Sequence, residues 1–338
     1  MLQPFSGAAC RRSTAIIGIV FFEKLCQKGA WVSRYDSIRN SLLILLIYTI
    51  HMLKNKDRNK PIPVENLDVH AINSCNLKCF GCNHLTDYGY GGPFTANELV
   101  QWIRPWRKRL YFKRINLLGG EPLLNLNLKE ICIGYRKFFP PDETKLRIVT
   151  NGILIKKCLW LKELIQKHHV HIQVSPHVLT GKAASAKRIA QVKEGLSLLE
   201  KWAADGPSRI ETRWAAPVDI KKKLNFQVFY QGSGNNIKPF EHDDIAGSKK
   251  HCTCKTLQLY KSHLYKCAPI AYIKEVLGKI GKANDPDWEP YLKYKPLPPG
   301  CSAAELKQFM EQLPLPEWVC KMCPPFSNVI LSEEREIY

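Results

Sequence analysis

Residues 67–82 have the sequence LDVHAINSCNLKCFGC, which joins a short apolar run to three closely spaced cysteines. The run Leu67–Ile72 is rich in apolar and β-branched residues and predicts a buried strand. Cys75, Cys79 and Cys82 follow it with the spacing CxxxCxxC. In folds built on parallel strands, functional residues lie in the loops that follow the strands. This loop is therefore the first candidate for a functional site.

The chain after this loop alternates short β-rich runs with helical stretches. The predicted strands are Leu67–Ile72, Arg114–Leu118, Leu146–Thr150, Val170–Ser175, Ile210–Trp214 and, with the weakest pattern, Phe226–Tyr230. The predicted helices are Thr95–Arg104, Leu128–Phe138, Leu159–His168 and Ala183–Ala204, the first begun by a capping box of Thr95 and Glu98. This α/β order fits an open sheet as well as a barrel. We predict a partial (β/α)6 TIM-like barrel with a small C-terminal cysteine-rich domain.

Composition limits the function classes without choosing among them. The 338 residues are 45% apolar and 24% charged, which excludes a disordered or collagen-like chain. Fifty Lys and Arg against thirty Asp and Glu give a formal charge of +20, which favours polyanions, acidic peptides or membrane headgroups as partners. Thirteen cysteines cannot all pair within the chain, and their clustering favours metal ligation.

The first 63 residues are predicted to be an N-terminal extension and basic linker. Their apolar runs, Ala15 to Phe22 and Leu42 to Ile50, are each about half of the roughly 20 residues that a membrane span needs. The first run lacks the small-residue cleavage site of a secretory signal. We therefore predict no transmembrane span and no export, with a core domain over residues 64–235 and a cysteine-rich domain over residues 236–338.

The three cysteines of the first loop can bind three irons of a four-iron cluster. The fourth iron would then lack a protein ligand. A zinc site prefers two CxxC pairs or added histidines. His84 lies two residues after Cys82, so the alternative to an iron-sulfur cluster is a zinc site with three cysteines and this histidine.

The order of the motifs resembles the radical S-adenosylmethionine (radical SAM) enzymes over residues 66–230. Gly119, Gly120, Glu121 and Pro122 follow the second predicted strand and correspond to the GGEP motif of that family, and Asn151 follows the third strand. The resemblance implies a 4Fe-4S cluster on Cys75, Cys79 and Cys82, with S-adenosyl-L-methionine (SAM) chelating the open iron. It also implies reductive cleavage of SAM to methionine and a 5'-deoxyadenosyl radical that abstracts a hydrogen atom from a substrate.

The resemblance implies roles for the residues behind the strands. Glu121 is expected to accept a hydrogen bond from the methionine ammonium, and the two glycines let a ligand approach the strand end without a Cβ clash. Asn151, Ser175 and His177 can bond the ribose hydroxyls or the methionine carboxylate, with an ordinary polar role as the equal alternative. Arg213 can pair with a carboxylate, or it is a solvated surface charge. No catalytic residue beyond the cluster is assigned.

The later cysteines resemble the C-terminal auxiliary-cluster extensions of radical SAM enzymes, the SPASM domain and the shorter Twitch domain. In those extensions a cysteine, a β-hairpin and a second cysteine precede a CxxC pair. The matching residues here are Cys254, a hairpin at Leu257–Lys266, Cys267, Cys320 and Cys323, with Cys252 and Cys301 as spare or substitute ligands. They imply a second 4Fe-4S cluster, with structural zinc or unliganded thiols as alternatives.

A metal is expected to stabilise this C-terminal region because it reads as poor in apolar residues. The one clear helix is Ala303–Leu313, begun by a capping box of Ser302 and Glu305.

We therefore predict a cytoplasmic radical SAM enzyme that takes electrons from a flavodoxin or ferredoxin-like donor. The resemblance allows a peptide, protein or small-molecule substrate, and we favour a peptide or protein. The first alternative is a radical SAM enzyme that modifies RNA, suggested by the charge of +20 but not favoured, because no RNA-binding module is recognisable. The second alternative is a non-catalytic iron-sulfur or zinc scaffold.

Overall fold

The computed structural model describes residues 60–79, 81–175, 177, 185–204, 210–212, 225–252, 254, 256–327 and 329–331, together with Leu43. The N-terminal extension, apart from Leu43 and residues 60–63, lies outside these residues, and so does Arg213. From Pro61 onward the chain forms one compact unit. Of the described helices, none is long and apolar enough to cross a bilayer.

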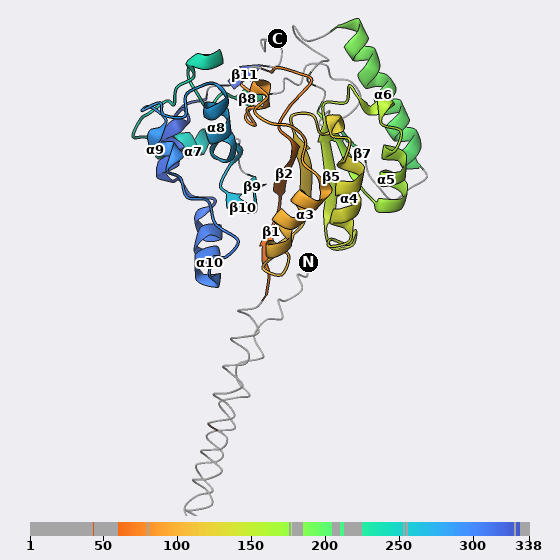
Figure 1. The fold of residues 1–338 in the computed structure, drawn as a ribbon, viewed down its shortest axis with the longest axis horizontal. Coiled ribbons are helices and arrows are strands. Elements are labelled where there is room, and N and C mark those ends of the chain that lie inside the picture. The colour runs from red at the N-terminus through yellow and green to blue at the C-terminus, as the bar shows by residue number, and fades with distance from the viewer. Residues whose placement is uncertain are drawn as a thin grey trace, which may run out of the picture. The chain divides into compact units, whose positions relative to one another are not determined.

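The centre of the unit is a seven-stranded sheet in the order β10-β9-β2-β4-β5-β6-β7 (Figure 1). Its strands are β2 (Leu67–Ile72), β4 (Arg114–Gly119), β5 (Lys145–Thr150), β6 (His171–Val174), β7 (Ile210–Thr212), β9 (Leu257–Tyr260) and β10 (His263–Tyr265). All neighbours pair in parallel except β9 and β10, which form an antiparallel hairpin. The α/β class is confirmed, and so is the predicted hairpin.

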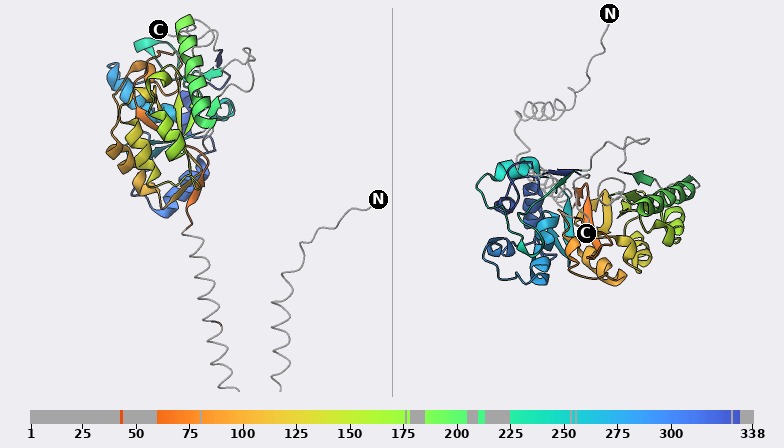
Figure 2. Two further views of the ribbon diagram at one scale, coloured as in Figure 1. Left: turned by 90° about the vertical axis from the view of Figure 1, so that its right-hand side faces the viewer. Right: turned by 90° about the horizontal axis from the view of Figure 1, so that it is seen from above.

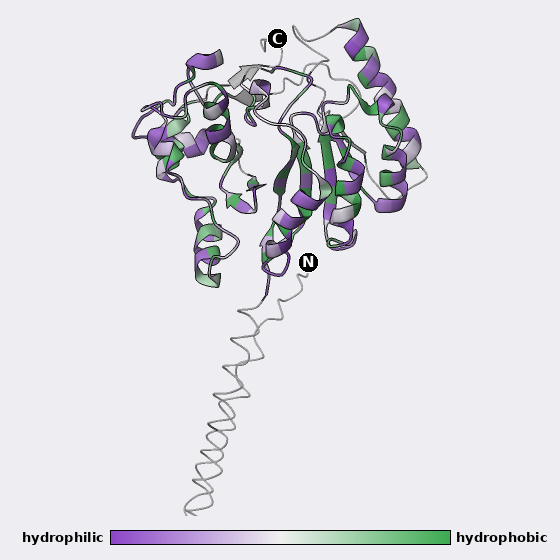
Figure 3. Ribbon diagram, in the orientation of Figure 1, coloured by the Kyte–Doolittle hydropathy of each residue, from purple (hydrophilic) through white to green (hydrophobic). Residues whose placement is uncertain are grey.

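Four helices connect the parallel strands and cover one face of the sheet (Figures 1 and 2). They are α3 (Ala96–Ile103), α4 (Leu128–Arg136), α5 (Leu161–His168) and α6 (Ala186–Ala204). Alternate strand residues such as Val69, Leu117 and Ile148 face these helices and form one buried apolar core. Figure 3 shows that the helices carry hydrophobic and hydrophilic residues in turn, as expected for helices with one buried face. The capping box of Thr95 and Glu98 is confirmed.

The sixth predicted strand, Phe226–Tyr230, does not join the main sheet as predicted. The structure has β8 (Asn225–Gln227) in a separate two-stranded sheet with β11 (Val329–Leu331), near the end of the chain. On the other side of the main sheet, β9 pairs with β2 instead. Long-range pairing of this kind leaves no local pattern in the sequence, so a run of apolar residues cannot reveal its partner. A second two-stranded sheet pairs β1 (Ile62–Val64) with β3 (Leu110–Phe112).

The region after residue 230 has more core than the sequence predicts. A helix that we did not predict, α8 (Ala268–Lys279), supplies many buried apolar residues, including Tyr272 and Val276. They pack with residues such as Phe229 and Trp288 in a second apolar core. The expectation of a thin core is therefore corrected. The other helices here are α7 (Ile245–His251), α9 (Glu289–Leu292) and α10 (Ala303–Gln312), and the capping box of α10 is confirmed.

Short 3-10 helices complete the unit. They are η1 (Thr86–Tyr88), η2 (Arg104–Trp106), η3 (Pro122–Leu124), η4 (Ile155–Lys157), η5 (Gly234–Asn236) and η6 (Trp318–Met322).

Candidate functional site

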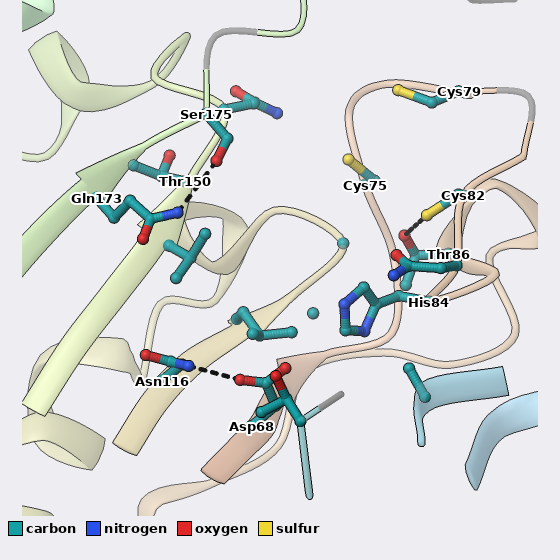
Figure 4. Close-up of a pocket in the computed structure, with 18 of the residues that line it drawn as sticks. Asp68, Cys75, Cys79, Cys82, His84, Thr86, Asn116, Thr150, Gln173 and Ser175 are labelled. Carbon is teal, nitrogen blue, oxygen red and sulfur yellow. Dashed lines mark hydrogen bonds between the residues drawn. The ribbon is translucent and has the colours of Figure 1, made fainter. Parts of the chain in front are cut away.

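The cysteine loop forms one wall of a cavity of about 520 Å³ at the carboxyl ends of the parallel strands. Cys75, Cys79 and Cys82 all line this cavity, and Figure 4 shows the three side chains on the same loop. Backbone hydrogen bonds between residues close in the sequence hold the loop. For example, the amide of Cys82 donates to the carbonyl of Cys79 at 3.2 Å. The fold therefore brings the three predicted ligands to one cavity, while their role as ligands stays a prediction.

Gly119 and Gly120 lie directly against the start of the cysteine loop. Gly119 has a φ of +141°, and a Cβ on it would lie 2.0 Å from the carbonyl oxygen of Ile72. A Cβ on Gly120 would lie 2.0 Å from the carbonyl oxygen of Ser74 and 2.7 Å from the amide nitrogen of Cys75. No side chain fits at either position, since these atoms belong to the backbone. Both glycines line the cavity, as the sequence predicts.

Glu121 is fully buried and connects the loops that follow β4 and β5. Its carboxylate accepts hydrogen bonds from the Thr150 hydroxyl and the Asn151 amide, both at 2.7 Å, and from the Leu123 amide at 3.0 Å. Burial raises the pKa of this carboxyl to about 7, although the three hydrogen bonds oppose the shift. In this structure the hydrogen bonds of Glu121 join the ends of β4 and β5. Its contact with a ligand stays a prediction. Pro122, also buried, begins η3.

The remaining predicted residues lie in the loops after β5 and β6. Asn151 lines the cavity, and its amide donates to Asn76 Oδ1 at 2.7 Å, which ties the β5 loop to the cysteine loop. Ser175 and His177 also line the cavity. Ser175 Oγ lies 3.5 Å from Gln173 Nε2 (Figure 4). The structure thus brings Asn151, Ser175 and His177 together around the cysteines, and Arg213 lies outside the described residues.

A polar floor beneath the cysteines was not predicted from the sequence. We use this name for six side chains of the strands that line the cavity: Asp68, Arg114, Asn116, Arg147, Gln173 and Gln258. They are polar residues at the positions that alternate with the apolar, helix-facing ones, and this period of two was the signal that could have found them.

Hydrogen bonds join most of the floor. Asn116 Nδ2 donates to Asp68 Oδ1 at 2.6 Å, and Figure 4 shows this pair below the cysteine loop. Arg147 Nε donates to Asn116 Oδ1 at 2.9 Å, and Gln258 Nε2 donates to Asp68 Oδ2 at 3.1 Å. The floor therefore combines residues of β2, β4, β5 and β9 in one rigid surface.

Two histidines, His70 and His84, add further polar side chains near the polar floor. His84 lines the cavity and its Nδ1 lies 2.8 Å from Nε2 of His70, which is fully buried and stacks on Tyr272. Burial, and then the neighbouring His84, holds the pKa of His70 well below its usual value. His70 is therefore neutral near pH 7, and the structure pairs His84 with it.

The donor set of the loop fits an iron-sulfur cluster. Thiols are the ligands that such clusters use, and three of them face one cavity here. Within the described residues, no three His, Cys, Asp or Glu side chains converge as they would on a single metal ion. A cluster takes one thiolate per iron, so its ligands need not converge on one point. Burial raises the pKa of Cys75 to about 12, so binding must displace its proton.

A second, smaller pocket collects five cysteines. They are the four predicted ligands and one of the two spare ones: Cys254, Cys267, Cys320, Cys323 and Cys252. Burial raises the pKa of Cys267 to about 12 and that of Cys323 well above its usual value. The pocket thus offers more thiols than a four-iron cluster needs.

Cys254 and Cys301 differ in their surroundings. Cys254 also lines the larger cavity, so the two sites adjoin. Cys301 lies elsewhere, where its sulfur accepts a hydrogen bond from Arg109 at 3.2 Å. Of the two spare cysteines, only Cys252 is placed to substitute for a predicted ligand.

Known proteins resemble the chain at this site. The radical SAM superfamily matches residues 69–195. A "Probable GTP 3',8-cyclase" of Archaeoglobus fulgidus is 32% identical over 94 residues, which cover 28% of this chain and 30% of that protein. The protein of the same name from Thermococcus kodakarensis is 30% identical over 139 residues, covering 41% and 42%. The chain thus spans less than half the length of these relatives.

Solved structures show weaker similarity. BtrN in complex with AdoMet and 2-DOIA has a TM-score of 0.41 and 17% identity, and covers 79% of this chain and 98% of its own. Streptococcus suis SuiB bound to S-adenosylmethionine has a TM-score of 0.36 and 18% identity, covering 60% and 45%.

Proposed function

We propose that the protein is an enzyme that binds a 4Fe-4S cluster through Cys75, Cys79 and Cys82, because residues 69–195 match the radical SAM superfamily. One observation carries the proposal: these cysteines share a cavity with two glycines that have no room for a side chain. When bound, the cluster supplies the electron that cleaves SAM to methionine and a 5'-deoxyadenosyl radical, which abstracts a hydrogen atom from a substrate.

The chain's own residues would position the ligands. Gly119 and Gly120 let the ligand approach the backbone at the end of β4. Asn151, held by its hydrogen bond to Asn76, offers its side-chain amide to a polar group of SAM, and Ser175 and His177 offer further polar groups in the same cavity. Glu121 holds the β4 and β5 loops in register, so that both sides of the cavity keep their shape.

The second site completes the proposed cofactor set. Five cysteines in one pocket support a second 4Fe-4S cluster, and structural zinc remains the alternative. Electrons would come from a flavodoxin or ferredoxin-like donor. Such thiolate sites need a reducing compartment, so we expect the protein to act in the cytoplasm.

We infer that the substrate is a small molecule. The curated relatives bear the name "Probable GTP 3',8-cyclase", which names a nucleotide as their substrate. The cavity also has a size typical of small-molecule sites. This inference replaces the peptide or protein favoured by the sequence, and RNA remains the less favoured alternative.

The test is the formation of 5'-deoxyadenosine. The full chain would be reconstituted with iron and sulfide without oxygen, and mixed with dithionite and SAM. We expect 5'-deoxyadenosine from the wild type and at least a hundredfold less from Cys79→Ala. Cys132→Ala is the matched control, because Cys132 is a buried core thiol away from the cavity. A wild type that holds iron but makes no product, or equal product from Cys79→Ala, would favour the scaffold.

A further inference from the structure

We propose that the substrate carries an anionic group, a phosphate or a carboxylate, which Arg114 and Arg147 bind at the polar floor of the cavity. The proposal deepens the proposed function, since it names the substrate class of the same site. It starts from the placement of two guanidinium groups in the cavity that the three cysteines line. Guanidinium groups bind phosphates and carboxylates through paired, charge-assisted hydrogen bonds.

The sheet places the two arginines on neighbouring strands and on the same face. In the parallel register of β4 and β5, Arg114 lies opposite Lys145, and Asn116 lies opposite Arg147. Residues two apart on a strand share a face, so Arg114 and Arg147 project to the same side, one step apart along the sheet. Both arginines line the cavity, so the face that they share is the one opposite the helices.

Arg147 is held in place before any ligand binds. It is 7% exposed, and its Nε donates to Asn116 Oδ1, whose own amide nitrogen donates to Asp68. Asp68 Oδ2 also accepts a hydrogen bond from Gln258 Nε2 at 3.1 Å, so the network extends from β2 to β9. This network orients the arginine, and a preorganised guanidinium loses little freedom when it binds an anion.

Arg114 has unused hydrogen-bonding capacity at the edge of the floor. Its Nη1 donates to Asn66 Oδ1 at 3.0 Å. Its Nε is buried and has no hydrogen-bond partner among the described residues. Unsatisfied buried donors are uncommon because they cost stability, and a bound acceptor would satisfy this one.

The charge of the floor favours an anion as well. Two arginines face one carboxylate, Asp68, among the six side chains of the floor. The cavity volume of about 520 Å³ lies in the range typical of small-molecule sites. A small anionic molecule satisfies both conditions.

The experiment measures binding of two anions to the full reconstituted protein by anaerobic calorimetry, with SAM present. Pyrophosphate is the phosphate probe and citrate the carboxylate probe, both at about 0.15 M salt to suppress unspecific attraction by the basic surface. We expect at least one probe to bind, and Arg114→Gln and Arg147→Gln to weaken it at least tenfold. The probe that binds more tightly identifies the anion as phosphate or carboxylate.

The matched control is Lys113→Gln, which removes the same charge next to Arg114 but at an exposed lysine paired with Glu65. It should leave binding unchanged. Arg147→Lys is the second variant if Arg147→Gln does not fold, and it should bind more weakly than wild type while keeping the charge.

Three results would overturn the proposal. These are no binding of either probe to wild type, equal weakening by Lys113→Gln, and loss of SAM binding in Arg114→Gln, which would assign the arginine to the SAM site. Failure of the proposed function would appear separately, as absence of 5'-deoxyadenosine from the wild type.

Discussion

At the scale of single residues, Gly120 fixes how closely the second strand approaches the cysteine loop. Replacing Gly120 by Ala places a Cβ against the backbone of Ser74 and Cys75, so one of the two segments must move. We expect a loss of about 2 kcal/mol in the free energy of unfolding, typical of overpacking at a rigid site. We also expect less iron per chain after reconstitution, because Cys75 is displaced.

The control for this change is Gly92→Ala. A Cβ on Gly92 would have no atom within 4 Å, and the residue has no left-handed φ, so its replacement should change stability by less than about 0.5 kcal/mol. Denaturant unfolding and iron analysis measure both variants. Equal effects of Gly92→Ala and Gly120→Ala would contradict the close approach seen at the strand end.

Glu121 gives the protein a predictable dependence of stability on pH. Its pKa is raised from 4.5 to about 7 by burial in the folded state, so the folded protein binds the proton more tightly than the unfolded chain. Its contribution to stability is therefore fully present below about pH 4.5 and declines as the pH rises to about 7, by roughly 3 kcal/mol in total.

Glu121→Gln removes this titration and should flatten the decline. Urea unfolding of the metal-free protein at about pH 5 and about pH 8 measures the difference between wild type and variant. If both proteins lose the same free energy of unfolding between these two pH values, the carboxyl does not titrate in this way.

The single residues show where sequence reasoning succeeds and fails. The cysteines and glycines could be predicted, because their spacing and order are specific and local. Arg114 and Arg147 could not, because each reads as an ordinary charge within a strand until the register of the sheet shows which face it occupies. The tie between Glu121 and the β5 loop was equally hidden, since it joins residues 30 positions apart.

At the scale of elements, the hairpin β9–β10 and η6 bring the C-terminal cysteines together. Cys267 follows the hairpin, whereas Cys320 lies in η6 and Cys323 directly after it. If they bind a second cluster, Cys320→Ala combined with Cys323→Ala should lower bound iron from about eight to about four per chain. The three-cysteine loop should keep its cluster in this double variant.

Cys301→Ala is the control for the double variant, because Cys301 lies by Arg109 outside the pocket. It should retain all of the iron. Iron and sulfide analysis of the reconstituted proteins decides the matter, and zinc in place of iron in the wild type would contradict a second iron-sulfur cluster.

The elements themselves were predictable where their pattern is amphipathic. Strands β2, β4 and β5 and helices α3 and α10 begin and end within a few residues of their predicted bounds. Helix α8 was missed because nearly all of its residues from Ala268 to Leu277 are buried, so no polar face marks its helical period. Strand β8 was misplaced because its partner β11 lies about a hundred residues later.

In the whole molecule, the two predicted domains, residues 64–235 and 236–338, contribute strands to one sheet. Strand β9 extends the main sheet next to β2, and Gln258 of β9 joins the polar floor. The ring nitrogen of Trp106 donates to the carbonyl of Ser262 at 2.9 Å, and Arg109 donates to the carbonyl of Pro299. The candidate cavity therefore depends on both regions, although the sequence predicts them as separate domains.

The formal charge of +20 did not identify a partner. A net charge describes attraction at long range, whereas recognition depends on which charges face a cavity. Arg114 and Arg147 at the polar floor therefore say more about the ligand than the net charge of the chain does. The sequence predicts the α/β class correctly but favours a peptide or protein as substrate, because the cavity that would bind the substrate is formed only by the folded sheet.

We propose that Cys75, Cys79 and Cys82 hold a cluster in which one iron lacks a protein ligand and binds SAM. Electron paramagnetic resonance of the dithionite-reduced protein tests it most directly, in the Cys320→Ala, Cys323→Ala background so that only one cluster contributes. We predict that adding SAM changes the spectrum of this cluster. A spectrum that is identical with and without SAM, or a loop that carries zinc and gives no cluster signal, would contradict the account.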